Sequence, residues 1–172
     1  MPSGDFLFNI AKGAFASTTT PSNIPAWDSA GGGTADFVCV FLGTGASAIL
    51  DAATAVDADS IGALTGLAAL ECTSTGYTAK GIALAGRNVT INDSTDTPAN
   101  RARYDANDVV ASAFTSAGAV NTVTDLLIAY ENATATFANY VPIARIKLVQ
   151  TYAPQGADFT VQWHADGIFT LS

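Results

Sequence analysis

The stretch DFVCVFL, residues 36–42, is the strongest indication of the fold in this chain. It is apolar on both faces of an extended strand and rich in valine and phenylalanine, which favour β-structure. A strand without a polar face must be covered on both sides, as an interior strand of a packed sheet is. We therefore predict a buried central strand formed by Phe37, Val38, Cys39, Val40 and Phe41.

Beyond residue 77 the sequence alternates apolar and small or polar residues with the period of two that half-buried strands have. In 141–149, for example, Ala144, Ile146 and Leu148 alternate with Arg145 and Lys147. Further strands are predicted at 78–84, 87–92, 108–114, 123–131, 158–164 and 167–171. The predicted fold class is mainly β, an antiparallel β-sandwich or jelly-roll-like fold with one or two short helices.

Two segments predict the short helices. Residues 5–16 carry apolar side chains at helical spacing, with Asp5 as a plausible N-cap. Residues 60–70 follow two acidic residues and also have an apolar face, although Gly62 and Gly66 lower their helix propensity. Residues 46–56 are small and polar, and no element is predicted there.

Residues 17–34 are rich in threonine, serine, proline and glycine, a composition typical of loops. This predicts an N-terminal helix or arm with its linker at 1–34 and a β domain at 35–172. The alternative is that 17–34 is a surface loop of one compact domain. Trp27 favours some anchoring of this stretch, because an unpacked tryptophan exposes a large apolar surface.

The composition argues against nucleic-acid binding. The chain has 172 residues, 13% of them charged, and a net charge of −8. A nucleic-acid-binding protein needs a basic patch that displaces counterions from phosphates. The basic residues here are few and scattered: Lys12, Lys80, Arg87, Arg101, Arg103, Arg145 and Lys147. The low charge indicates either a surface covered by neighbours or one coated with small polar residues.

The N-terminal sequence lacks the basic start and long apolar core of a signal peptide, and no run approaches the ~18 apolar residues of a membrane span. We expect a soluble protein made in a cytosol. Cys39 and Cys72 are then expected to be free thiols, with Cys39 buried in its strand, and a disulfide between them is the alternative.

The residues that usually carry catalysis are sparse. His164 is the only histidine and lies on the polar side of its predicted strand. No nucleophile motif, phosphate-binding loop or zinc-ligand spacing accompanies it. We therefore expect no enzymatic activity and no cofactor, and a small hydrolase is the least favoured alternative.

Two acidic clusters lie in and near 93–107, which is predicted to be a polar loop. One contains Asp93, Ser94, Asp96 and Thr97, and the other Asp105, Asn107 and Asp108. Such oxygen ligands suit Ca²⁺, but neither cluster has the spacing of a calcium loop. Because Asp and Asn side chains cap their own backbone, turn formation is the favoured interpretation.

Several motifs, taken in order, resemble a family of small structural proteins of tailed-bacteriophage virions. They are FNIAKGAFA (8–16), DADSIGALTGLAALE (57–71), STGYTAKGIA (74–83), NDSTDTPANRARYDANDVV (92–110), DLLIAYE (125–131), VPIARIKL (141–148) and WHADGIFTLS (163–172). The resemblance covers most of the chain. It implies a virion structural role of the head-decoration or minor-tail type.

On this basis we expect a capsid decoration protein on the head exterior, with a tail or fibre component as the alternative. The expected partners are other virion proteins, such as the major capsid protein or tail proteins, and further copies of the chain; neither nucleic acid nor membrane is expected. The proposed assembly contacts are the apolar residues near the N-terminus, Phe6, Leu7, Ile10 and Phe15.

A carbohydrate-binding module for host attachment is an alternative of a different class. It would present aromatic side chains on one exposed patch. The candidates are Trp27, Tyr104, Tyr130, Tyr140, Tyr152 and Trp163, for which packing in the core is the favoured interpretation.

Overall fold

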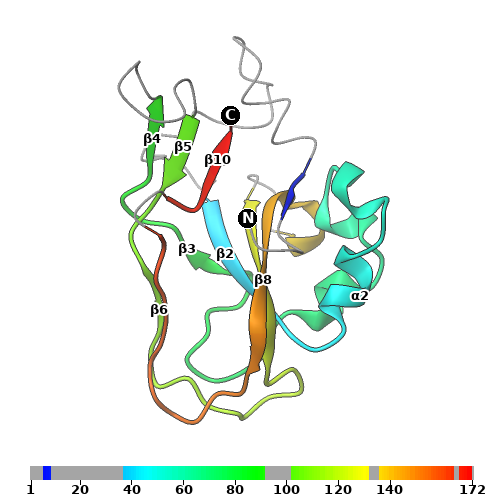
Figure 1. The fold of residues 1–172 in the computed structure, drawn as a ribbon. Helices are drawn as coiled ribbons and strands as arrows, with labels where there is room; N and C mark the ends of the chain where they lie inside the picture. The colour runs from blue at the N-terminus through cyan, green and yellow to red at the C-terminus, as the bar shows by residue number, and fades with distance from the viewer. Residues whose placement is uncertain (1–5, 9–36, 92–101, 132–135, 165–166, 172) are drawn as a thin grey trace.

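The computed structural model describes residues 6–8, 37–91, 102–131, 136–164 and 167–171. Its centre is a five-stranded antiparallel sheet with the order β1-β8-β7-β2-β3 (Figure 1). The strands are β1 (Phe6–Leu7), β2 (Phe37–Leu42), β3 (Ile82–Ala83), β7 (Val123–Tyr130) and β8 (Val141–Tyr152). The apolar stretch at 37–42 is therefore an interior strand, as predicted.

Two smaller antiparallel sheets lie on one side of the central sheet. One has the order β10-β5-β4, formed by β4 (Asn88–Ile91), β5 (Ala102–Asp105) and β10 (Phe169–Leu171). The other pairs β6 (Val109–Ala111) with β9 (Phe159–Val161). The mainly β, antiparallel class is thus confirmed, and the sandwich or jelly-roll topology stays a prediction.

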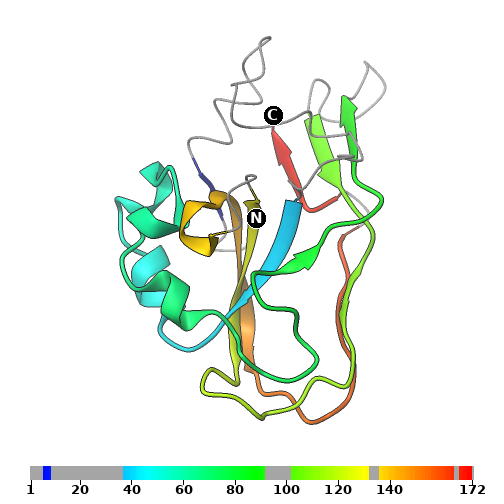
Figure 2. The ribbon, with the colours of Figure 1, turned by 180° about the vertical axis from the view of Figure 1, so that it is seen from behind.

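Short helices cover the other side of the central sheet (Figures 1 and 2). They are α2 (Ala46–Leu50) and the 3₁₀ helices η1 (Ala55–Asp57), η2 (Ile61–Ala63), η3 (Leu67–Leu70) and η4 (Phe137–Asn139). Leu50, Ile61 and Leu67 of these helices are buried in the core beneath them.

The central sheet therefore separates two apolar cores. Because successive side chains in a strand point to opposite faces, β2 contributes to both. Phe37, Cys39 and Phe41 enter the core on the side of the small sheets. Val38, Val40 and Leu42 enter the core beneath the helices.

Several predicted elements are corrected. Residues 6 and 7 form a strand rather than part of a helix, and the rest of 5–16 lies outside the described residues. The predicted helix at 60–70 is two 3₁₀ turns, because Gly66 interrupts it with φ +86°. Helix α2 occupies part of 46–56, where no element was predicted.

The segment 93–107 is not loop throughout, because β5 occupies 102–105. This strand pairs with β4 and β10 despite its polar sequence, which obscured the β pattern. Cys39 and Cys72 are both buried free thiols. Within the described residues, no helix is long and apolar enough to cross a membrane.

Candidate functional site: a charge network beneath helix α2

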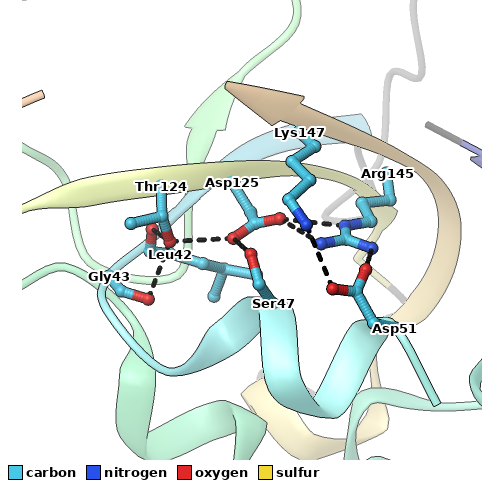
Figure 3. Close-up of polar contacts among 8 residues, drawn as sticks. All are labelled: Leu42, Gly43, Ser47, Asp51, Thr124, Asp125, Arg145 and Lys147. Carbon is cyan, nitrogen blue, oxygen red and sulfur yellow. Dashed lines mark hydrogen bonds and ion pairs between the residues drawn. The ribbon is translucent and has the colours of Figure 1, made fainter. Parts of the chain in front are cut away.

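A buried ion pair joins the two longest strands of the central sheet. Asp125 of β7 and Arg145 of β8 have exposed fractions of 0% and 1%. Nε and Nη2 of Arg145 both donate to Oδ1 of Asp125, at 2.9 and 2.6 Å. The pair lies on the sheet face that helix α2 covers (Figure 3). Two opposite charges are thus held inside the protein, where an unpaired charge would be costly.

Asp51, which directly follows α2, links this pair to the surface. Its Oδ1 accepts from Nη1 of Arg145 at 2.5 Å, and its Oδ2 accepts from Nζ of Lys147 at 3.0 Å. The Arg145 and Lys147 hydrogen bonds lower the pKa of the Asp51 carboxyl below its usual value. The side chains of Asp51 and Lys147 are 48% and 36% exposed, so water screens their part of the network.

Hydroxyl groups complete the hydrogen bonding of Asp125. The Ser47 hydroxyl in α2 donates to Oδ2 of Asp125 at 2.9 Å, and the Thr124 hydroxyl lies 2.8 Å from the same oxygen. Thr124 Oγ1 is also 3.0 Å from the carbonyl oxygen of Gly43. The network therefore connects β7, β8, the end of β2 and α2, as Figure 3 shows.

The contacts of this network are structural: they join helix α2 to strands β7 and β8. Both oxygens of Asp51 and both of Asp125 accept hydrogen bonds from side chains of this network. Two acids balance two bases, so the group is neutral overall. We infer that the network orients α2 on the sheet.

A second polar cluster lies where β2 extends past the end of β3. The Tyr77 hydroxyl donates to Oε1 of Glu71 at 2.9 Å and accepts from the backbone N–H of Phe41 at 3.3 Å. The backbone N–H of Lys80 also donates to Glu71. Burial raises the pKa of the Glu71 carboxyl above its usual value. Tyr77 thus occupies a backbone donor that β3 is too short to reach.

The proposed assembly contacts are only partly described. Phe6 and Leu7 form β1, and Leu7 is buried in the core on the side of the small sheets. Ile10 and Phe15 lie outside the described residues. The structure therefore packs the beginning of this segment on the chain's own sheet, and its role in assembly stays a prediction.

The remaining candidates are distributed over the chain. His164 is exposed, and its carbonyl accepts from the N–H of Gly167. In the second acidic cluster, Oδ1 of Asp105 accepts from the neighbouring Ala106 N, whereas Oδ1 of Asp108 accepts from Trp163 N, which is distant in the sequence. The first cluster, at 93–97, lies outside the described residues. Among those described, no group of three or more His, Cys, Asp or Glu residues could hold a metal ion.

The candidate aromatic residues do not form a common exposed patch in the part of the chain that is described. Tyr104, Tyr130 and Tyr140 are buried in the core. Tyr152 and Trp163 are half-buried, and Trp27 lies outside the described residues. Core packing is therefore the environment of the three tyrosines.

Sequence reasoning missed the charge network. The alternation in 141–149 places Arg145 and Lys147 on the face opposite the apolar residues of a half-buried strand, and it does not identify their partners. An available signal was the acidic residue at the start of the apolar run DLLIAY in the neighbouring strand. Its significance required the register, which places Asp125 opposite Lys147 and Leu127 opposite Arg145.

No family model, curated protein or solved structure matches this chain in the comparisons with known proteins.

Proposed function

We propose that this chain is a structural protein of a tailed-bacteriophage virion, most simply a capsid decoration protein on the head exterior. The observation that carries the proposal is the ordered set of motifs, from 8–16 to 163–172, that resembles such proteins. The charge network supports a structural role, because its contacts hold helix α2 on the central sheet.

The distribution of charge supports association with neighbouring proteins. Arg145 and Lys147, two of the seven basic residues, bond to Asp51 and Asp125 within the chain. Of these four side chains, Arg145 and Asp125 are buried and have no further hydration to lose when another protein approaches. A surface with few charges has less solvation to lose on association, which favours packing against a shell.

The net charge of −8 supports the exterior of the head over its interior. An acidic chain is repelled by packaged nucleic acid, whereas binding to phosphates needs clustered basic residues. A tail or fibre position satisfies the same electrostatic argument and is the second candidate.

The copy number of the chain in purified particles tests both positions. The phage whose genome encodes the chain would be purified through a density gradient, and its proteins quantified by mass spectrometry against isotope-labelled peptides. Hundreds of copies per particle are expected for a decoration protein. A handful of copies would favour the tail candidate, and absence from intact particles would overturn the virion proposal.

A further inference from the structure

The N-terminal strand occupies a well-defined slot beside β8. Phe6 pairs with Arg145 and Leu7 with Ala144, and the N–H of Phe8 donates to the carbonyl of Ile143 at 2.9 Å. Leu7 is buried in the core on the side of the small sheets, and Phe8 is buried in the core beneath the helices. Residues 6–8 thus lie along one strand, and Leu7 and Phe8 each contribute a side chain to a different core.

The connection from this strand to β2 is far longer than the structure requires. β1 ends and β2 begins at the same end of the sheet, since Phe8 lies beside Ile143 while Phe37 pairs with Tyr130, itself paired with Val141. The two strands are three strand spacings apart, about 14 Å. The 28 residues from 9 to 36 can span roughly 90 Å when extended.

The slot is also held by few backbone pairs. β1 pairs with β8 at two positions, whereas β2 pairs with β7 at six. A short edge strand at the end of a long connection can leave its slot without the remaining strands having to separate.

We propose that β1 is an exchangeable strand, and that residues 6–8 of one copy occupy the β8 slot of a second copy. The occupant is another copy of this chain because a second copy carries the Leu7 and Phe8 side chains that fit this slot in this register. Every contact of the intramolecular arrangement is retained, so the exchange is decided by concentration rather than by new interactions.

A second copy must compete with the effective concentration of the chain's own tethered β1 strand, and this concentration can be reached in solution. A short tether holds its end at an effective concentration in the millimolar range, and longer tethers lower this value. Subunits arrayed side by side reach comparable local concentrations. The inference does not require the virion role and is tested on the purified chain, so the two proposals can fail separately.

The test is a disulfide between two different variants, Leu7→Cys and Ala144→Cys. Because Phe8 bonds to Ile143, the Leu7–Ala144 pair is a non-hydrogen-bonded pair, whose Cα atoms lie about 4.5 Å apart and suit a disulfide. Each variant carries one introduced cysteine. A disulfide linking residue 7 to residue 144 can therefore form only between chains.

The two variants, with tags of different mass, are unfolded, mixed and refolded at a total concentration of about 1 mM, near the effective concentration of the tethered strand. After mild oxidation we expect a heterodimer on non-reducing gels, with the 7–144 linkage identified by mass spectrometry. Its yield should fall at least tenfold when refolding is carried out at a thousandfold lower concentration.

A control is Val38→Cys mixed with Ala129→Cys, a pair from the interior β2–β7 ladder. It should give no interchain linkage, because those strands do not exchange. The parent chain, treated identically, reports any contribution from the buried Cys39 and Cys72. Equal linkage in the test and control pairs, or a lack of the 7–144 linkage at about 1 mM, would overturn the proposal.

A second measurement needs no substitution and remains informative if the cysteine variants fold poorly. The parent chain is refolded at about 1 mM and at a thousandfold lower concentration, then both samples are compared by size-exclusion chromatography at the same final concentration. A dimer only in the concentrated sample is expected. Monomer alone in both samples would contradict strand exchange.

Discussion

At Arg145 a positive charge is held in the core of the protein by the carboxylates of Asp125 and Asp51. The desolvation of such a charge is offset only while its partners remain in place. The two ends of the network differ in this respect, because Asp125 is buried whereas Asp51 and Lys147 are in contact with water.

Replacing Arg145 tests the buried end. Arg145→Met keeps much of the side-chain volume but leaves the Asp125 carboxylate buried without its cation, so we expect a loss of about 3–5 kcal/mol in unfolding free energy. Urea unfolding at neutral pH measures it. Lys147→Met, at the solvent-facing end, should cost no more than about 1 kcal/mol.

The double variant Arg145→Met, Asp125→Leu removes both buried charges and should be more stable than Arg145→Met alone. If the single variants of Arg145 and Lys147 were equally stable, the buried pair would not be the dominant part of the network.

The pKa of Asp51 predicts a dependence on acid. Because its pKa is lowered in the folded state, this carboxylate contributes stability above its unfolded value of 3.8, and the contribution is lost as the pH falls through the folded pKa. Asp51→Asn should therefore be less stable than the parent at neutral pH, and the difference should close below about pH 4.

Urea unfolding at neutral and acidic pH measures the difference, with Asp59→Asn, at another exposed side chain, as the control. The control should lie close to the parent at neutral pH. If the stability difference between Asp51→Asn and the parent persisted unchanged in acid, the ionised Asp51 carboxylate would not be the source of the stabilisation.

At the scale of the element, β2 depends on close approach of the chain that leads into β3. Gly81, at φ +104°, lies against β2 so closely that a Cβ atom there would be 2.8 Å from Cβ of Val38. Gly156 has a similar φ of +87° but nothing within 4 Å of the same position. Both glycines adopt a left-handed backbone conformation, but only Gly81 lacks space for a Cβ atom.

Alanine at each glycine separates these effects. Both variants incur the left-handed backbone cost of about 1–2 kcal/mol, and Gly81→Ala adds about 1–3 kcal/mol for displacing Val38. Thermal melting should therefore rank Gly81→Ala clearly below Gly156→Ala. Similar melting temperatures would mean that β2 and the turn before β3 can move apart at little cost.

Phe41 is the aromatic centre of β2. Its ring stacks on Tyr77 and meets Phe114 and Phe159 edge-on, with centroids 5.0 to 5.9 Å apart. Phe41→Ala should lower the unfolding free energy by about 3–5 kcal/mol, because it leaves a cavity among these rings. Denaturant unfolding measures this loss. The control is Val110→Ala, at a 44% exposed position, which should change the unfolding free energy by about 0.5 kcal/mol or less.

For the molecule as a whole, Leu7 and Phe8 pack in the two cores of the central sheet. Phe8 is fully buried although 28 residues separate it from β2. Phe8→Ala should therefore cost about 3–5 kcal/mol, close to the effect of Phe41→Ala, in the same single unfolding transition. Val149→Ala, at a 93% exposed position, is the control. A Phe8→Ala variant as stable as the control would show that β1 contributes little to the folded state.

The amino-acid sequence by itself determined the class of the fold and the interior position of 37–42. Apolar composition over consecutive residues requires cover on both faces, and alternation requires a half-buried strand, so both patterns act through local geometry. They located β2, β7 and most of β8 well. These patterns did not predict the strands at 102–105 and 6–7. There the β-structure depends on pairing with strands distant in the sequence rather than on local propensity.

The candidate site was decided by the tertiary structure alone. Asp125 and Arg145 are twenty positions apart, and Asp51 is more than seventy positions from either; nothing in their local sequence identifies them as partners. They meet because the β7–β8 register aligns two strands and α2 covers that face of the sheet. A charge on a strand is solvated or buried according to what packs above it, and that depends on long-range contacts rather than on neighbouring residues.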